Sequence, residues 1–309
     1  MQSFSRTKSY IIAVIAALVI ITGGLYFKNR HNGSTQIIAI TQIASHPSLN
    51  LIRQGVIDEL TDSKALNGKY KVVFENAQGN IATAAQISQK FAGLRPKVIV
   101  AITTPSAQTM KNAIKNTGIK MVFSAVTDPI GANLVADFID HDDQITGTVD
   151  LPPIQSQLQT ILKYRPQAKR IGVVFNPGEI NSVKQVDKLK EYAAAAGVEI
   201  LLAPATKTVD VGTATTRLVG AVDAFYVPND NTVVSAIESL IKVAKQHGKL
   251  VMVSDPESLA KGADIALAND QYQVGRETGK LVYQILNGEN VGQIPVKMVE
   301  AARLTLNRK

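Results

Sequence analysis

The sequence predicts an α/β fold class with two similar lobes, each built on a parallel β-sheet. Short apolar runs such as Val98–Ile102 alternate with amphipathic segments. Strands that are apolar along their whole length are typical of parallel sheets covered on both faces. The pattern also repeats: a strand, a polar helix cap, a helix, a second strand and Asp-Pro follow one another from Val98 and again from Ala224. Because this long unit occurs twice, we expect two lobes rather than a solenoid.

The first lobe is expected to begin after a polar linker, His31 to Gln36. Asn80 has the residue type and the position of a helix N-cap. The alternation of apolar and amphipathic runs predicts strands at 37–43, 70–77, 97–102 and 120–126, and helices at about 49–60, at 80–91 and between the last two strands.

A second series starts at Arg170 and repeats the alternation of strands and helices. It predicts strands at 170–175, 198–203, 224–228 and 249–254, with helices at 183–196, near Thr213 and at 233–247. Segments rich in Gly, Pro and Asn near Gly147, Asp255 and Gly288 are expected to cross between the lobes. Three crossings place the last long helix, 271–286, on the first lobe. The predicted boundaries are 1–34 for an N-terminal segment, 35–147 and 256–287 for the first lobe, and 148–255 and 288–309 for the second.

The N-terminal segment predicts export. Arg6 and Lys8 precede an uncharged apolar run of 18 residues, Tyr10–Phe27. That length is at the short end for a membrane-spanning helix and is longer than the apolar part of most cleaved signals. We therefore expect either an uncleaved membrane anchor, which is favoured, or a cleaved signal peptide. Either one places the rest of the chain on the extracytoplasmic side, in a periplasm or at the cell surface.

Composition excludes several classes of function. The chain contains no cysteine, which excludes disulfides, thiolate catalysis and a lipid-modified cysteine. Four of the net +8 charges lie in residues 1–34, and the others are scattered, so a nucleic-acid partner is not expected. The sequence has no phosphate-binding loop, nucleophile elbow or dinucleotide fingerprint, and its four histidines lack ligand partners at helical spacing. We expect no catalytic residue, no metal and no cofactor.

The stretch "VIVAITTPSAQ" is the strongest candidate for a binding site. In a parallel sheet the ligand site lies at the carboxyl ends of the strands. Thr104 has the character of an N-cap, Pro105 suits the first helical position, where no N–H is needed, and Ser106 follows with a free backbone N–H. Hydroxyls and unpaired N–H groups at the positive end of a helix can bind an anion such as a carboxylate. The alternative is a well-capped helix without a ligand.

The loops of the second series face this one and contain acids. Asp230 adds a carboxylate beside the expected cap Asn231, so the two loops together would suit a zwitterion. Ser45 and His46 could stand at a helix start, and Asn181 and Ser182 opposite them. Asp128 and Asp255 each precede a proline, and turn formation is an alternative role for both.

These motifs resemble a known family. The stretches "ASHPSLNLIRQGVIDEL", "VIVAITTPSAQ", "VFSAVTDPIGANLV", "YVPNDNTVVSAIESL" and "DQYQVGRETGK" resemble the ABC-transporter substrate-binding proteins of the tryptophan/tyrosine-binding type. The resemblance extends from about Gln36 to the C-terminus. It implies the type I periplasmic binding-protein fold, in which two Rossmann-like lobes are joined by a three-strand hinge. It also implies capture of a small solute, often an aromatic amino acid, and delivery to an ABC permease with its ATPase.

The resemblance also implies roles for particular residues. The family's carboxylate-binding position corresponds to Thr104, Pro105 and Ser106. The remaining ligand-binding positions that it implies are Ser45, His46, Thr127, Asp128, Asn181, Ser182, Asp230, Asn231 and Asp255. Two departures matter: Ser45 stands where many members have a glutamate, and the lipid-bearing cysteine of many members is missing. Either amino-group recognition or the identity of the ligand is therefore expected to differ, and the N-terminal segment is expected to be the tether.

Two other functions remain open at this point. The same fold could serve as a membrane-anchored sensor that reports a ligand to a receptor. A small-molecule hydrolase would need an acid-rich cleft, for which Asp128, Asp230, Asp255 and Asp270 are available. A transcription regulator is disfavoured, because an apolar segment stands where a DNA-binding helix-turn-helix would be.

Overall fold

A computed structural model describes residues 35–300 and 302–307 of the chain. The segment 1–34, in which the sequence predicts an anchor or export signal, lies outside the described residues. Within the described ranges, no helix combines the length and the apolar character needed to cross a membrane.

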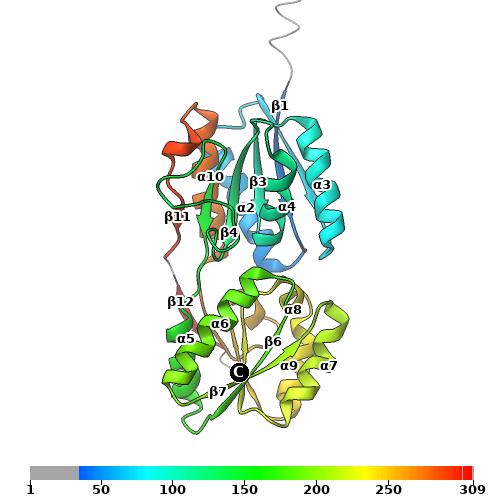
Figure 1. Ribbon diagram of the computed structural model, residues 1–309, viewed down its shortest axis with the longest axis vertical. Helices are drawn as coiled ribbons and strands as arrows, with labels where there is room; N and C mark the ends of the chain where they lie inside the picture. Colours follow the sequence, from blue (N-terminus) through cyan, green and yellow to red (C-terminus); the bar gives the residue numbers. More distant parts are fainter. Residues whose placement is uncertain (1–34, 301, 308–309) are drawn as a thin grey trace, which may run out of the picture. The chain divides into compact units, whose positions relative to one another are not determined.

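The first lobe is built on a six-stranded sheet in the order β11-β5-β4-β3-β1-β2. Its central strands β1 (Gln36–Gln42), β3 (Val98–Ile102) and β4 (Lys120–Val126) pair in parallel. Helices α2 and α10 pack together, as do α3 and α4 (Figure 1). The other elements are β2 (Tyr70–Asn76), β5 (Ile145–Val149), β11 (Lys297–Met298), α2 (Pro47–Asp62), α3 (Ile81–Leu94), α4 (Thr104–Ile114) and α10 (Gln271–Leu286).

The second lobe repeats this plan with the sheet order β12-β10-β9-β8-β6-β7. Strands β6 (Arg170–Phe175), β8 (Ala224–Val227) and β9 (Leu250–Val253) pair in parallel, whereas β12 (Arg303–Leu306) runs antiparallel to β10 (Ile265–Ala268). The remaining elements are β7 (Glu199–Pro204), α5 (Ile154–Tyr164), α6 (Ile180–Ala195), α7 (Val211–Val219), α8 (Asn231–Ser235), α9 (Ile237–Gln246) and two short 3₁₀ turns, η1 (Thr208–Asp210) and η2 (Pro256–Leu259); a third, η3 (Val291–Gln293), belongs to the first lobe, beside β5. Two parallel α/β lobes are therefore confirmed.

The chain crosses between the lobes three times, but at later positions than the sequence predicts. The first crossing follows β5, which ends at Val149 rather than near Gly147. The second is not at Asp255, because β10 pairs with β9 in the second sheet; the chain crosses at 269–270 and enters α10. The third follows β11, which pairs with β5 of the first sheet, so residues near Gly288 still belong to the first lobe. These boundaries depend on which strands pair within each sheet, and the composition of the loops does not reveal that pairing.

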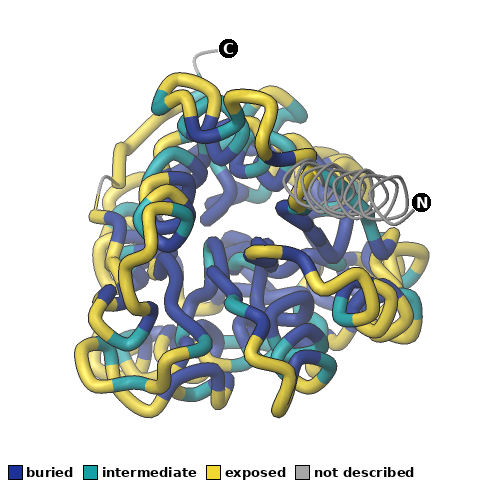
Figure 2. The backbone as a smooth tube through the Cα atoms, turned by 90° about the horizontal axis from the view of Figure 1, so that it is seen from above, coloured by how far each residue is buried: buried dark blue, intermediate teal, exposed yellow. Residues whose placement is uncertain are grey.

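Each lobe has its own hydrophobic core. The central strands of both sheets are buried almost throughout, whereas the edge strands β2, β7, β11 and β12 are partly or fully exposed. Buried backbone lies in the interior of each lobe and exposed backbone at its outside (Figure 2). One cluster of buried apolar residues fills the first lobe, and two clusters fill the two faces of the second sheet. Each lobe thus has a core of its own, and Ile180 of α6 in the second lobe also packs against the core of the first.

Helices α2 and α10 approach so closely that their backbones touch. A Cβ added to Gly275 would lie 2.1 Å from the carbonyl oxygen of Ile52, and one added to Gly55 would lie 2.3 Å from that of Tyr272. Arg276 on α10 also pairs with Glu59 on α2 at 2.8 Å. Because α10 directly follows the second crossing, this contact fixes the position of α2 relative to the hinge.

We expect Gly275→Ala to destabilise the protein by about 1–3 kcal/mol, because the added methyl group collides with rigid backbone. Gly93→Ala is the matched control, since a Cβ at this position in α3 meets nothing within 4 Å. It should be neutral or slightly stabilising, because alanine favours a helix over glycine. Urea unfolding followed by circular dichroism measures both variants, and equal stabilities would contradict the close-packing argument.

Candidate functional site

The first wall of the site is the turn between β3 and α4. Thr103 is the N-cap of α4 and has φ 78° and ψ 160°, so the cap lies one residue before the predicted Thr104. A positive φ is strained for a β-branched residue and is commonest at functional sites. Ala125 on β4, where the β4–β5 register shifts, has φ 54°. The two strained residues line the same cavity, so the backbone is distorted where this wall forms.

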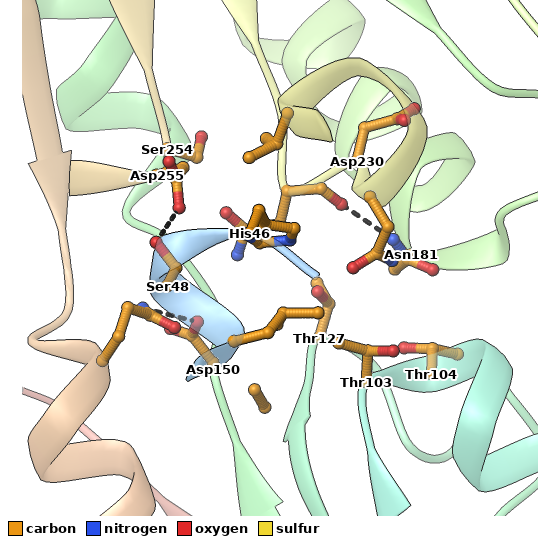
Figure 3. A pocket seen from close by; sticks show the side chains of 16 residues that line it. His46, Ser48, Thr103, Thr104, Thr127, Asp150, Asn181, Asp230, Ser254 and Asp255 are labelled. Carbon is orange, nitrogen blue, oxygen red and sulfur yellow. Dashed lines mark hydrogen bonds between the residues drawn. The ribbon is translucent and has the colours of Figure 1, made fainter. Parts of the chain in front are cut away.

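This cavity lies between the lobes and has a volume of about 40 Å³. The first lobe, the second lobe and the hinge crossings all contribute to its wall (Figure 3). The lining residues are His46, Ser48, Leu49, Thr103, Thr104, Ala125, Thr127, Asp150, Asn181, Asn229, Asp230, Asn231, Val234, Ser254, Asp255 and Gln271. Among them the structure describes three aspartates, and it describes no lysine, arginine, phenylalanine or tyrosine.

Several buried polar atoms at this cavity have no hydrogen-bond partner among the described residues. They are the hydroxyls of Thr103 and Thr104, both ring nitrogens of His46 and the amide oxygen of Asn181. The hydroxyl of Ser106, fully buried in the first turn of α4, also lacks a partner. Buried polar groups are normally paired, and an unpaired one costs about 1–3 kcal/mol. Such a concentration of unpaired groups at one cavity is typical of a ligand site.

The lobes also contact each other directly beside the cavity. The Ser48 hydroxyl, at the start of α2, donates to the Asp255 carboxylate at the end of β9 (Figure 3). On the other side, Gln185 Nε2 on α6 donates to the Thr127 hydroxyl at 3.3 Å. These contacts are polar and few, so they can hold the lobes together and still exchange for contacts with water when the lobes part.

Glu179 organises the second-lobe wall, and the sequence reasoning did not single it out. Its buried carboxylate accepts from the backbone N–H groups of Asn231 and Thr232, each at 3.0 Å. The Asn231 amide donates to it at 2.6 Å, and the Asn181 amide at 3.2 Å. The carboxylate therefore holds the α8 turn and orients two amide side chains of the cavity. The only sequence signal was its position two residues before the predicted Asn181.

Asp230 lies at the cavity wall, but its carboxylate caps α8 instead of facing the centre. Its Oδ1 accepts from the N–H of Val233 at 2.9 Å, and its Oδ2 from the N–H of Asn176 at 2.6 Å. Figure 3 shows the carboxylate directed away from His46. Asp230, and not the predicted Asn231, is therefore the N-cap. Ala236, with φ −119°, then separates α8 from α9, so the single helix predicted at 233–247 is two helices.

Burial lowers the pKa of one titratable group of the site and raises the pKa of another. Burial lowers the pKa of His46, with the charge of Asp255 opposing the shift, so the imidazole is neutral at neutral pH. Burial, together with the nearby charge of Glu179, raises the pKa of Asp230 to about 7. Both shifts disfavour charge in a water-poor region between the lobes.

A second buried carboxylate stands at the hinge. Asp150 begins the first crossing, and its two oxygens accept from the side-chain amides of Asn269 at 2.7 Å and Gln271 at 3.1 Å. These donors lie at the second crossing and at the first residue of α10. Burial raises the pKa of Asp150, and the charge of Asp255 adds to the effect. The two crossings are thus joined by hydrogen bonds at the edge of the cavity.

The structure brings most of the predicted site residues together. Ser45 and Pro105 line a neighbouring groove, which also includes Asn231. Asp128 lines a third groove, and its carboxylate accepts from the N–H of Gly131 at 2.8 Å, which is the turn role open from the sequence. Ser106 and Ser182 are fully buried and do not line the cavity. The predicted residues that line it are His46, Thr104, Thr127, Asn181, Asp230, Asn231 and Asp255.

Nine lining residues were not predicted, and two of them, Asp150 and Gln271, lie at the hinge crossings. Gln271 belongs to the quoted stretch "DQYQVGRETGK", but only the crossing topology shows that it and Asp150 reach the cavity. Ser254 lies directly before the predicted Asp255, and Ser48 lies in the first turn of α2. Thr103 is the first hydroxyl of the quoted Thr-Thr-Pro-Ser stretch and could have been included on that ground.

The fold and this interlobe cavity are those of a solute-binding protein, and the comparisons specify the family. The chain belongs to the ABC transporter substrate binding protein family, whose model matches residues 37–309. It is 35% identical over 271 residues to a tyrosine-binding protein from Clostridioides difficile (strain R20291), which covers 87% of this chain and 78% of the relative. Substrate-binding proteins of ABC transporters take a small-molecule ligand and work outside the cytoplasm with the transporter.

Solved structures agree with this assignment. A conserved domain protein from Vibrio cholerae O1 biovar El Tor is 37% identical with a TM-score of 0.84, covering 88% of this chain and 92% of that one. An ABC domain from Streptococcus pneumoniae in complex with L-Trp is 31% identical with a TM-score of 0.85, at the same coverage. A ligand-free, open substrate-binding protein from Clostridium difficile is 34% identical, again at the same coverage, but has a TM-score of 0.66. The arrangement of this chain is thus more similar to the L-Trp complex than to the open structure.

We expect the contribution of Asp230 to the free energy of unfolding to fall as the pH rises from 5 to 7. Its pKa in the folded protein, about 7, exceeds the unfolded value of 3.8, so the folded state binds more protons in this range. This contribution is complete below the unfolded pKa and is lost as the pH rises through 7. Asp230→Asn should therefore make the unfolding free energy less dependent on pH across this window, as measured by urea unfolding at several pH values.

Asp223→Asn is the matched control for this measurement. The N–H groups of Lys169 and Arg170 lower the pKa of Asp223, so its contribution changes only at more acidic pH. The slope between pH 5 and pH 7 should be as in the wild type. A wild-type slope in Asp230→Asn would contradict the assignment.

Proposed function

We propose that this protein captures a free amino acid between its two lobes and delivers it to an ABC permease. The observation that carries the proposal is the set of unpaired buried polar atoms on both sides of one interlobe cavity. A ligand with hydrogen-bonding groups would satisfy them, which would favour closure around it. The tyrosine-binding relative and the L-Trp complex make an amino acid the leading ligand class.

The first-lobe wall suits the carboxylate of such a ligand. Thr103, Thr104 and Ser106 present hydroxyls at the N-terminus of α4, an 11-residue helix. The positive end of the helix dipole and the first-turn N–H groups favour an anion there. Since the described lining contains no lysine or arginine, neutral hydrogen-bond donors would bind the carboxylate.

The size of the cavity makes movement of the lobes part of this function. An apolar cavity of about 150 Å³ holds benzene, whereas this one has about 40 Å³. To hold a tyrosine or tryptophan side chain, the lobes must therefore move apart and close again around a larger cavity. Aliphatic residues Leu49, Ala125 and Val234 would contact such a ring, because the described lining contains no aromatic residue except His46.

Residues 10–27 are proposed to tether the protein to the membrane. The support is the basic and then apolar sequence, together with the missing lipid-bearing cysteine. Fractionation of cells that produce the full chain should place it in the membrane pellet, and mass spectrometry should find the N-terminal residues intact. A soluble product that starts after Phe27 would instead establish a cleaved signal.

Calorimetric titration of the twenty L-amino acids tests the capture proposal. We expect micromolar or tighter binding of one or a few of them, and a decrease in affinity of about 10- to 100-fold in Thr104→Val. The decrease follows from losing one hydrogen bond to a charged group, which is worth about 1.5–3 kcal/mol.

Thr216→Val is the control for this variant. Thr216 lies on α7, is exposed and donates to the Gly212 carbonyl, far from the cavity in the sequence and in the lobe. It should bind as the wild type does. Folded wild-type protein that binds none of the twenty amino acids would overturn the proposal.

A further inference from the structure

We propose that two carboxylates of the cavity, Asp150 at the first crossing and Asp255 at the start of η2, bind the ammonium group of the ligand. This inference rests on the proposed capture of an amino acid. It assigns the recognition of positive charge to this pair, and not to Asp230, which the sequence had suggested.

The aspartates of the described cavity lining are not matched there by any lysine or arginine. Asp150 and Asp255 are 4% and 6% exposed and both line it. The described residues of the lining supply no cation to either of them. Lys261, whose charge acts on His46, is not part of the lining and lies 3.9 Å from Glu238. Buried carboxylates without a cation are costly, so a ligand that brings a positive charge offsets this cost.

The hydrogen bonds that these carboxylates make leave room for a ligand. Amides of Asn269 and Gln271 donate to Asp150, and the hydroxyls of Ser48 and Ser258 donate to Asp255. All four are neutral donors. A carboxylate has about four acceptor positions, and each of these has two of them in use. An ammonium group, which has three donors, matches what remains.

Unpaired groups point to a ligand at the same cavity independently of the acids. The His46 imidazole, 7% exposed, has no partner for either nitrogen among the described residues and lies at the centre of the view in Figure 3. Thr103 and Thr104 lie at one side of that view, and Asp150 and Asp255 lie at the other. The cavity thus has a neutral, donor-rich side and an acidic side, which orients a molecule that carries both charges.

The pKa of Asp150 is consistent with this role. Burial raises it, and the negative charge of Asp255 raises it further against the amide donors. A bound ammonium would reverse both effects, because it favours the ionised carboxylate. Since Asp150 also links the first two crossings, the positive charge of the ligand would bind directly at the hinge.

The test compares ligands that differ only in the amine. L-tyrosine and L-tryptophan are titrated beside 3-(4-hydroxyphenyl)propionate and indole-3-propionate, which lack it. In the wild type the amino acid should bind at least about 30-fold more tightly than its desamino partner, as expected for charge-assisted hydrogen bonds. In Asp150→Asn that ratio should fall to less than about 3, through weaker binding of the amino acid while the desamino compound binds unchanged.

If Asp150→Asn does not fold, Asp255→Asn is the second variant. The same decrease in the ratio of amino-acid to desamino affinity is expected. Asp187→Asn, an exposed acid on α6 outside this cavity, is the control and should keep the wild-type ratio. A wild-type ratio in both Asp150→Asn and Asp255→Asn, with amino-acid binding intact, overturns this inference and leaves the proposed function standing. Failure of the wild-type protein to bind any of the four compounds overturns the proposed function for these ligands, and the inference with it.

Discussion

The burial of polar groups between two lobes is the constraint on which this site depends. Each lobe completes its own apolar core, so the interface between them need not be apolar and instead collects hydroxyls, amides and carboxylates. Groups of this kind are stable in water when the lobes are apart and are stable when closed only if each finds a partner. Ser48–Asp255 and Gln185–Thr127 satisfy part of this requirement within the protein. The unsatisfied remainder is what a ligand can supply, which links binding to closure.

The local structures at the cavity all position polar groups at strand ends. The strained Thr103 turns the chain so that α4 begins with its hydroxyls at the cavity. Glu179 performs a similar task in the second lobe, where it accepts the N–H groups of the α8 turn and fixes Asn181 and Asn231. In the first lobe the Gly-mediated contact of α2 with α10 fixes the start of α2, where His46 and Ser48 lie. Rigid supports thus hold each wall, and the motion is left to the crossings.

The proposed ammonium site lies partly at the hinge between the lobes. Asp150 joins the first crossing to Asn269 and Gln271, and it lines the cavity at the same time. A ligand that touches this carboxylate therefore contacts the part of the chain that must bend when the lobes part. The second-lobe acid that seemed best placed from the sequence, Asp230, is instead used to cap α8.

The sequence by itself determined the two α/β lobes, eight of the described strands and the approximate positions of most helices, and it named seven of the sixteen residues that line the cavity. These depend on apolar periodicity and on caps such as Asn80, which are interactions within a few residues of each other. It also indicated the family through "TTPSAQ" and its accompanying motifs. Tertiary structure alone decided where the chain crosses between the lobes, because strand pairing and not loop composition assigns β10 and β11 to their sheets. It likewise decided that Asp230 caps a helix while Asp150 and Gln271 reach the cavity, since the direction of a side chain depends on partners distant in the sequence.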